Sequence, residues 1–423
     1  MIPQAQASSY DLVIVGKGFA GLACIKKAFE QKLKFCVVAR DYGATAHFSG
    51  AFDMIDANWA DPGRSAKDCP AQSEALREFV RAHPSHLYSS LLQRNPQLAS
   101  SLFDEVAEFF SFYQLPVMGD GREAVVVFDP TGKPRVAGAS LISHSLRPRD
   151  LHENQQVIYV RFPHLTQYPT DIIVARLKKL FSEVTVIDYS SWEAPVVSPL
   201  AGYLRHFDEQ KNVEGLCELI SRKAAQVPLI FLPPVLGIKH HFVHHQLCQQ
   251  KTGAKVVELL STLPSSAGLR LTHLLDDRLN QLGIECVTGE ACPFACTDDV
   301  SAGLPIRGGC QGGSDRPHLR ANVYLLATGK YVGGGVKAQS FFSEPITRAP
   351  LYLDGRAVSP SANMTQLVTP QADLSQDFMR LGVSLSQNSK NIKYCGHVLA
   401  GFDYTREGCG FGVSMASALS CFS

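Results

Sequence analysis

The beginning of the chain contains two short apolar runs separated by an amphipathic segment. Residues 11–15 and 35–39 are rich in apolar and β-branched residues, as expected of parallel strands that are buried on both faces. The segment between them repeats apolar residues at helical spacing, namely Leu22, Ala23, Ile25, Ala28 and Phe29. The pattern predicts a strand–helix–strand unit of about thirty residues and an α/β fold with a parallel sheet.

The pattern changes between residues 59 and 264, where amphipathic helices alternate with short strands and Pro-Gly turns. Helices are expected over 73–82 and 98–113. Strands are expected over 124–128, 157–160 and 227–231. We predict an inserted α+β substrate or cap domain over residues 59–264. Residues 1–58 and 265–423 would then form the two parts of one Rossmann-like domain.

The last third of the chain returns to alternating helix and strand. The expected elements are a helix at 269–281, a strand at 284–287, a loop or hairpin at 302–316, a strand at 323–327 and a helix at 413–419. The strand at 323–327 ends in Thr328 and Gly329, and a glycine-dense segment at 396–412 precedes the last helix.

Three glycines follow the first strand in the spacing of a dinucleotide-binding turn. Gly16 permits a sharp turn, Gly18 lets a pyrophosphate approach the backbone, and Gly21 lets the helix pack closely on the strand. Ala20 lies within the same turn. The position of this motif between a buried strand and an apolar-periodic helix favours cofactor binding over a purely structural turn.

The end of the second strand departs from the usual pattern. An acidic residue that binds the adenosine ribose is expected there, but the sequence has Arg40, followed by Asp41. Arg40 is either a phosphate contact or a solvated strand end. Asp41 is a candidate for the ribose contact. If Asp41 does not make this contact, binding of an ADP-ribose group is weaker.

Composition and charge restrict the possible partners. The chain has 423 residues, of which 45% are apolar and 19% charged, with a net charge of +1. There is no strong positive field to attract nucleic acid or anionic lipid. The sequence shows neither an apolar run of about 18 residues nor a secretory signal pattern. Its twelve cysteines include no CxxC pair. We expect a cytoplasmic protein with reduced thiols, no nucleic-acid partner and no direct membrane span.

The C-terminal part of the chain favours a flavin over a nicotinamide cofactor. Thr328 and Gly329 end a strand in the manner of flavoproteins in which the chain returns to the sheet beside the cofactor. The glycines at 408–412 would place backbone amides at a helix N-terminus, which stabilises negative charge at the N1–C2=O edge of a reduced flavin. The alternative is a glycine-rich turn that caps a structural helix.

Several motifs together resemble a known family. They are residues 16–21, 46–53, 83–84, 262–270, 326–329, 333–335, 344–346 and 396–403, with 401–403 and 407–410 the most specific. In this order they are similar to the B subunit of anaerobic glycerol-3-phosphate dehydrogenase, a flavoprotein of the FAD/NAD(P)-binding superfamily. The segment from about residue 90 to 250 matches only loosely.

The resemblance implies an activity, a cofactor and partners. It implies oxidation of glycerol 3-phosphate to dihydroxyacetone phosphate, with electrons passed to quinone. It implies FMN as the flavin, although FAD remains open, and Arg40 agrees with the family. A second flavoprotein subunit and an iron–sulfur subunit would hold the protein at the periphery of the inner membrane.

The residues suggest three groups for the chemistry of hydride transfer to a flavin. His47 and His397 are candidate bases for the hydroxyl proton, or ordinary hydrogen-bonding residues. Arg270 is a candidate phosphate clamp, or a solvated helix residue. The candidate cofactor-binding residues are Gly16, Gly18, Ala20, Gly21, Arg40, Ser49, Gly50, Thr328, Gly329, Gly396, Gly401, Gly408, Cys409 and Gly410.

Two further clusters contain residue types that bind metal ions. The spacing of Cys286, Cys292, Cys296 and Cys310 matches no usual zinc or iron–sulfur motif. The group His240, His241, His244 and His245 has no acidic residue nearby in sequence and favours a surface helix or a wall of the inserted domain. We expect no metal site.

Three functions remain open at this point. The first is a flavin-dependent dehydrogenase that acts on glycerol 3-phosphate or a similar small compound. The second is a non-catalytic flavin-binding subunit that relays electrons or stabilises a catalytic partner. The third is a stand-alone flavin dehydrogenase or oxidase for another small hydroxy substrate.

Overall fold

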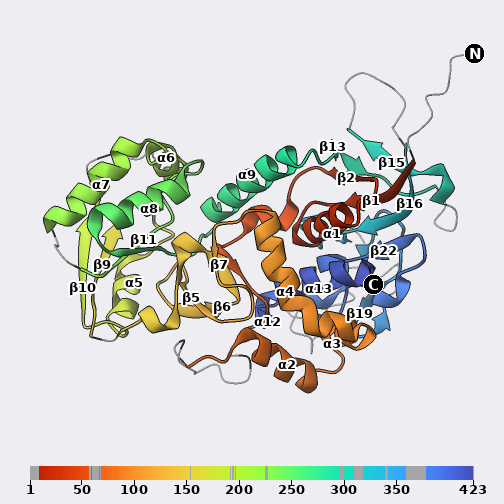
Figure 1. Cartoon of the computed structure of the whole chain (residues 1–423), viewed down its shortest axis with the longest axis horizontal. Helices are drawn as coiled ribbons and strands as arrows, with labels where there is room; N and C mark the ends of the chain where they lie inside the picture. The colour runs from red at the N-terminus through yellow and green to blue at the C-terminus, as the bar shows by residue number, and fades with distance from the viewer. Residues whose placement is uncertain are drawn as a thin grey trace, which may run out of the picture. The chain divides into compact units, whose positions relative to one another are not determined.

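The computed structural model consists of two compact units, each built from separate stretches of the chain (Figure 1). Unit 1 comprises residues 1–45, 76–112 and 278–423, and unit 2 comprises residues 46–75 and 113–277. The structure describes residues 9–56, 59, 66, 68–152, 154–190, 192, 195, 197–223, 227–295, 300–308, 318–338, 342–358 and 378–422. Among these residues, no helix combines the length and apolar character needed to cross a bilayer.

Unit 1 is organised around a seven-stranded sheet with a parallel centre. The parallel strands are, in spatial order, β13 (Cys286–Thr288), β2 (Phe35–Ala39), β1 (Ser9–Val15), β16 (His318–Leu326) and β22 (Ile392–Tyr394). The antiparallel strands β15 (Leu304–Arg307) and β14 (Glu290–Ala291) extend the sheet. Val13 of the central strand pairs with Cys36 and Tyr324. This order confirms the predicted Rossmann-like α/β fold.

Four helices of unit 1 pack against one another, and the first of them also lies against the sheet (Figure 1). They are α1 (Phe19–Glu30), α3 (Leu87–Arg94), α4 (Pro96–Phe112) and α13 (Gly410–Leu419). The rings of Phe110 and Phe411 stack with centroids 5.7 Å apart, which joins α4 to α13. Lys26 of α1 is buried and reaches Glu105 and Glu108 of α4.

The remaining elements of unit 1 are short and lie mostly in its C-terminal part. The strands are β17 (Lys337–Ala338), β18 (Phe342–Ser343), β19 (Leu351–Leu353), β20 (Arg356–Ala357) and β21 (Gly382–Val383). The short helices are η4 (Val300–Ala302), η5 (Leu385–Gln387), η6 (Gly396–Val398), α12 (Tyr404–Glu407) and η7 (Ser420–Phe422).

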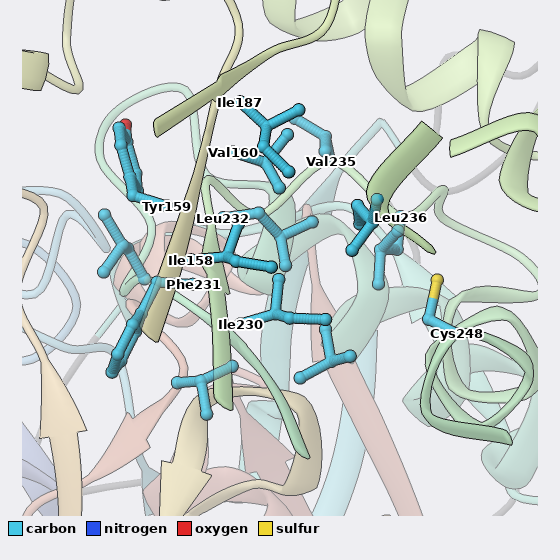
Figure 2. Packing of buried hydrophobic residues seen from close by; sticks show 14 of the residues in the cluster. Ile158, Tyr159, Val160, Ile187, Ile230, Phe231, Leu232, Val235, Leu236 and Cys248 are labelled. Atoms are coloured by element: carbon cyan, nitrogen blue, oxygen red, sulfur yellow. The ribbon is translucent and has the colours of Figure 1, made fainter. Parts of the chain in front are cut away.

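Unit 2 contains a second parallel sheet, with the order β10-β9-β11-β12. These strands cover Glu183–Asp188, Gln156–Arg161, Leu229–Leu232 and Lys255–Glu258, respectively. Figure 2 shows side chains of β9 and β11 gathered with Ile187, Val235, Leu236 and Cys248 in the core. Phe231 is fully buried and packs edge-on against Phe128 at 4.7 Å. Each fully buried side chain of this size contributes about 1.5–3 kcal/mol relative to an exposed one.

The other elements of unit 2 are helices and small antiparallel sheets. The helices are α5 (Thr170–Leu177), α6 (Pro199–His206), α7 (Gln210–Lys223) and α8 (His241–Thr252), with η2 (Ile142–His144) and η3 (Pro148–Asp150). One three-stranded sheet has the order β3 (Ala51–Phe52), β7 (Ala139–Leu141), β4 (Val117–Met118). The other has the order β6 (Pro134–Ala137), β5 (Val125–Phe128), β8 (Ser145–Leu146).

The two units divide the chain differently from the predicted insertion at 59–264. Residues 76–112 lie in unit 1, because the apolar faces of α3 and α4 pack on α13. Residues 46–56 and 265–277 lie in unit 2. Three elements run across the division of the chain: η1 (Gly43–His47), α2 (Gln72–Ala82) and α9 (Ser266–Gln281).

Close backbone packing in unit 1 requires glycine at two of the predicted positions. Gly16 has φ +102°, and a Cβ there would collide with the carbonyl oxygen of Ala327 at the end of β16. A Cβ on Gly21 would collide with the carbonyl oxygen of Gly16. The turn can therefore form only where both side chains are absent.

We predict that Gly21→Ala destabilises unit 1 by about 3 kcal/mol or more, because the new methyl group meets rigid backbone. Gly215→Ala is the matched control, since Gly215 is also inside a helix but a Cβ added there would meet no described atom within 4 Å. The control should gain about 0.5–1 kcal/mol from the higher helix propensity of Ala. Urea unfolding measures both changes. Equal stabilities of the two variants would contradict the packing described here.

Candidate functional site

The turn between β1 and α1 leaves one glycine that the fold itself does not require. Gly18 precedes α1 with φ −72°, a conformation open to any residue. A Cβ at Gly18 would lie 3.2 Å from Thr45 Oγ1, a side-chain neighbour that can shift. The Phe19 amide donates a hydrogen bond to the same Thr45 Oγ1 at 3.3 Å. Gly18 therefore keeps a face of the turn open, as a dinucleotide-type ligand needs.

The end of β16 lies against this turn and carries an unsatisfied hydroxyl group. Thr328 Oγ1 is buried and finds no hydrogen-bond partner among the described residues. Gly329 follows with φ +71°. A Cβ on Gly335 would collide with Gly329 O and Thr328 Oγ1, so glycine is required there as well. A buried hydroxyl group without a partner costs free energy, which a bound ligand would recover.

The C-terminal glycine segment packs on the beginning of α1. Gly396 has φ +75°, and a Cβ there would lie 2.7 Å from Ala20 Cβ. The ring of Phe411, in the first turn of α13, meets the ring of Phe19 edge-on at 5.1 Å. The structure thus brings together Gly16, Gly18, Ala20, Gly21, Thr328, Gly329, Gly396 and Gly410, all of unit 1.

His397 is held in one orientation within this segment. Its Nε2–H donates a hydrogen bond to Gly410 O at 3.0 Å, and its ring stacks on Tyr404 with centroids 4.4 Å apart. Burial lowers the pKa of His397 to about 4; the hydrogen bond to Gly410 opposes this effect, and the charge of Lys330 adds to it. His397 is therefore neutral at physiological pH, and Nδ1 is the nitrogen that can accept a proton.

Lys330 directly follows Gly329 and was not among the predicted site residues. Its side chain is buried, its Nζ donates to Met379 O, and it lies 5.2 Å from the centroid of the Phe402 ring. Burial lowers the pKa of Lys330 to about 7, against the influence of Asp403. A lone lysine after a strand end carries no sequence signal that separates it from a solvated one.

The loop between η6 and α13 is held together by Glu407. Its Oε2 accepts hydrogen bonds from the Asp403 amide at 2.7 Å and from His86 Nε2–H at 3.0 Å. Its Oε1 accepts from Arg380 at 3.3 Å. Gly401 and Gly408 have φ +92° and +52° and form turns of this loop. The two turns shape the segment that connects η6 to α13.

His86, Glu407 and Cys409 place their ligand atoms within 4.8 Å of one another. However, His86 Nδ1 accepts a hydrogen bond from the Tyr88 amide at 3.1 Å, so the ring proton must lie on Nε2. That nitrogen donates to Glu407 and is not available to a metal ion. We interpret the three residues as a hydrogen-bonded group that fixes the loop.

Arg40 and Asp41 lie at the end of β2 and are both exposed. Asp41 Oδ1 accepts a hydrogen bond from the Gly43 amide at 2.6 Å, which shapes the turn into η1. A Cβ on Gly334 would lie 3.7 Å from Arg40 Nη2. The Arg40 guanidinium group therefore lies beside the loop that follows β16.

Arg270 lies in the interior of unit 2, whereas a phosphate clamp was expected to offer its guanidinium group to a substrate. Its side chain is fully buried and donates to both oxygens of Glu258, at 2.5 and 3.0 Å, and to Gly237 O at 2.8 Å. Burial acts to raise the pKa of Glu258, but Arg270 and His144 lower it to about 2. The guanidinium group is thus committed to a buried ion pair in the protein.

Three other predicted residues lie in unit 2. His47 is exposed at the end of η1. Ser49 accepts a hydrogen bond from the Ser261 amide at 2.8 Å through its carbonyl oxygen. Gly50 has φ +116°, and a Cβ there would lie 2.9 Å from the His144 ring, so glycine is required by packing.

The cysteine and histidine clusters are separated or buried in the structure. Cys286 is exposed in β13 and Cys292 is buried, whereas Cys296 and Cys310 lie outside the described residues. Three histidines of α8 face the interior of unit 2: His241, His244 and His245. His245 Nε2–H donates to Val256 O at 2.8 Å, which ties α8 to β12.

The order of the parallel strands and the glycine turn define a protein of the Rossmann-like α/β fold class. No protein-family model matches the chain. It is 28% identical over 432 residues to the B subunit of anaerobic glycerol-3-phosphate dehydrogenase from Yersinia pseudotuberculosis, covering 97% of this chain and 96% of that protein. The protein of the same name from Pectobacterium carotovorum is 26% identical, with 97% of each chain covered. The chain is therefore a relative of these proteins, which confirms the resemblance.

Two solved structures are similar at a much lower level. Mycobacterium smegmatis Sdh1 in complex with UQ1 is 11% identical with a TM-score of 0.38, covering 97% of this chain and 67% of that chain. A 3-ketosteroid delta1-dehydrogenase from Sterolibacterium denitrificans is 14% identical with a TM-score of 0.34, covering 76% and 48%. TM-scores this low carry no weight for function.

We predict that Arg270→Met destabilises the protein by about 3–5 kcal/mol, because it leaves the Glu258 carboxylate buried without its partner. Arg278→Met is the control on the same helix. Arg278 is partly buried and donates to Phe112 O, so its loss should cost about 1 kcal/mol. Denaturant midpoints at pH 7 measure both. A destabilisation no larger than that of the control would show that the buried pair does not stabilise unit 2.

Proposed function

We propose that the chain is a flavin-binding oxidoreductase subunit whose cofactor is held in unit 1. The observation that carries this proposal is the convergence of three glycine-containing segments on one turn. No packing contact of the described residues requires Gly18, and the Thr328 hydroxyl group beside that turn is buried without a partner among them. Both features fit a ligand that approaches the backbone closely and accepts a hydrogen bond.

Each part of unit 1 would contribute differently to holding the flavin. The Gly16–Gly18 turn and the N-terminus of α1 would bind its phosphate, and Thr328 would donate its hydroxyl hydrogen. Arg40, beside the loop after β16, would supply a cation in place of the ribose-binding acid. The absence of that acid favours FMN, with FAD as the alternative. Ser49 and Gly50 have packing and backbone roles in unit 2 and are weaker candidates.

The bound flavin would accept a hydride from a substrate alcohol. His397 is the best candidate for the accompanying proton, because its Nε2–H is fixed on Gly410 O and its Nδ1 can act as the acceptor. The start of α13 at Gly410 would direct amide dipoles toward the cofactor. His47 remains a candidate base at an exposed position. Unit 2 would serve as a substrate or cap domain.

Glycerol 3-phosphate is the proposed substrate, on the strength of the relatives' name. Electrons would pass to quinone through a second flavoprotein subunit and an iron–sulfur subunit. These partners would hold the chain at the cytoplasmic face of the membrane. A relay subunit without its own substrate site is the second candidate, and the buried position of Arg270 favours it, because the expected phosphate clamp is occupied by Glu258.

We predict that the purified protein is yellow and releases FMN on acid precipitation, as identified by chromatography. In the flavin-free form, Gly18→Ala should unfold at the same temperature as the wild type, since φ is ordinary and only Thr45 must shift. Its flavin content should fall by about tenfold or more, because the methyl group blocks the approach of the flavin phosphate to the backbone. A colourless wild-type protein that binds no added flavin would refute the proposed function. Full flavin occupancy in Gly18→Ala would refute the placement.

We predict that glycerol 3-phosphate bleaches the flavin of the isolated chain in stopped-flow experiments if the chain is catalytic. His397→Gln keeps an N–H donor for Gly410 O but removes the proton-accepting nitrogen, so bleaching should slow by about 10²-fold or more. Bleaching only after the partner subunit is added would support the relay. Peroxide formation in air without a partner would identify an oxidase. An unchanged rate in His397→Gln would exclude His397 as the base.

A further inference from the structure

Lys330 is a buried amine that no carboxylate of the described residues neutralises. Its side chain is 3% exposed, and its Nζ donates to the carbonyl oxygen of Met379. Within the described part of the chain, no carboxylate oxygen forms an ion pair with it. An ammonium group buried in this way loses hydration that one neutral carbonyl does not replace.

Two other large buried cations of the chain have acidic partners. Lys26 reaches three carboxylates, those of Glu30, Glu105 and Glu108. Arg270 is paired through two hydrogen bonds with Glu258. These pairs account for the burial of Lys26 and Arg270 in structural terms. The described contacts of Lys330 offer no such account, and a buried lysine of this kind is a candidate for a functional role.

The position of Lys330 links the segments that surround the proposed flavin. It follows Thr328 and Gly329, which end the strand that packs on Gly16. Its ammonium group faces the ring of Phe402, in the loop that leads from His397 to α13. Its charge also influences His397. Lys330 therefore lies where the β16 end and the C-terminal segment approach each other within unit 1.

We propose that Lys330 is a proton-holding residue of this site, neutral beside an oxidised flavin and protonated when reduction adds negative charge. This inference rests on the proposed function. Oxidation of an alcohol to a ketone releases two electrons and two protons. One proton travels with the electrons as the hydride and the other leaves the hydroxyl group. The site gains two electrons and one proton with the hydride. If Lys330 Nζ takes up a second proton, two positive charges balance the two electrons and the net charge of the site does not change.

The surroundings of Lys330 make both protonation states accessible near neutral pH. Burial lowers its pKa to about 7. Negative groups oppose this effect and positive groups add to it. The titratable and charged groups that act on Lys330 are Asp403, Arg380, Cys409 and Glu407. His397 also faces it, since the charge of Lys330 helps to lower the pKa of His397. A negative charge formed nearby on reduction would raise the proton affinity of the amine.

We predict that the flavin potential depends on pH through Lys330. The wild type should take up one more proton per two electrons than Lys330→Met between about pH 7 and the higher pKa that Lys330 has once the flavin is reduced. Below and above this interval, the two potentials should change in parallel. Lys330→Arg keeps a permanent positive charge, so its potential should lie above that of Lys330→Met with the same slope. Lys393→Met is the matched control, since Lys393 also donates to a backbone carbonyl, that of Cys421, and it should follow the wild type. Spectroelectrochemical titration measures all four proteins.

A second measurement needs no flavin. In the unfolded chain Lys330 titrates near its ordinary pKa of about 10.4, whereas in the folded chain its pKa is lowered to about 7. As pH falls between these values, the unfolded state binds a proton that the folded state does not, so the wild type loses stability. Over this interval, lowering the pH should therefore make Lys330→Met more stable relative to the wild type.

The outcomes separate the two proposals. A wild-type protein that binds no flavin overturns the proposed function and this inference with it. A flavoprotein in which wild type and Lys330→Met have parallel potentials at every pH overturns this inference alone. A stability difference that does not change with pH also overturns it. If Lys330→Met fails to fold, the comparison of wild type with Lys330→Arg decides, because Arg cannot release its proton.

Discussion

The site in unit 1 depends on the close approach of three backbone segments, which only glycine permits. Gly16 lies against the carbonyl group of Ala327, and Gly21 lies against the carbonyl group of Gly16. Side chains at either position would separate α1 from the sheet. This packing fixes the end of β16 beside the turn, and so determines where Thr328 and Lys330 lie. Gly396, packed on Ala20, then brings the C-terminal segment to the same helix.

The parts of the fold that could be predicted are those with a local signal. The strands at 9–15 and 35–39, the glycine turn and the strand that ends at Leu326 combine apolar pattern with fixed spacing. The assignment of residues 76–112 to unit 1 could not be predicted, because an amphipathic helix shows that it has a partner but not which one. The sequence did not distinguish the parallel sheet of unit 2 from an antiparallel one, for a similar reason. A short apolar run alone fits either a parallel strand or a strand in the core of a sandwich, and in unit 1 it was the glycine turn with its fixed spacing that favoured the parallel arrangement.

The candidate site was predicted in part, and the misses concern charge. Arg270 follows a serine-rich turn that looks suited to an anion, yet its partner Glu258 lies twelve residues earlier on a separate strand. Nothing in the local sequence shows that the two residues are buried together. Lys330 was missed for the opposite reason, since lysine after a strand end is ordinarily solvated. The roles of Arg270 and Lys330 are determined by their burial and by whether they have an ion-pair partner, and both are properties of the folded chain.

The distinction between a catalytic and a relay subunit depends on how an anionic substrate would be bound. Arg270 does not offer its guanidinium group, and Arg380 is engaged by Asp354 and Glu407. Lys330 is buried, and the negative charges of Asp403 and Glu407 act on it, which disfavours a phosphate dianion beside it. Proton uptake at Lys330 requires only that the flavin be reduced, whether by a substrate or by a partner protein. The same residue therefore suits both roles. The two roles differ in where the electrons come from. A catalytic role requires a cation of this chain that binds the anionic substrate in contact with this site, whereas a relay role does not.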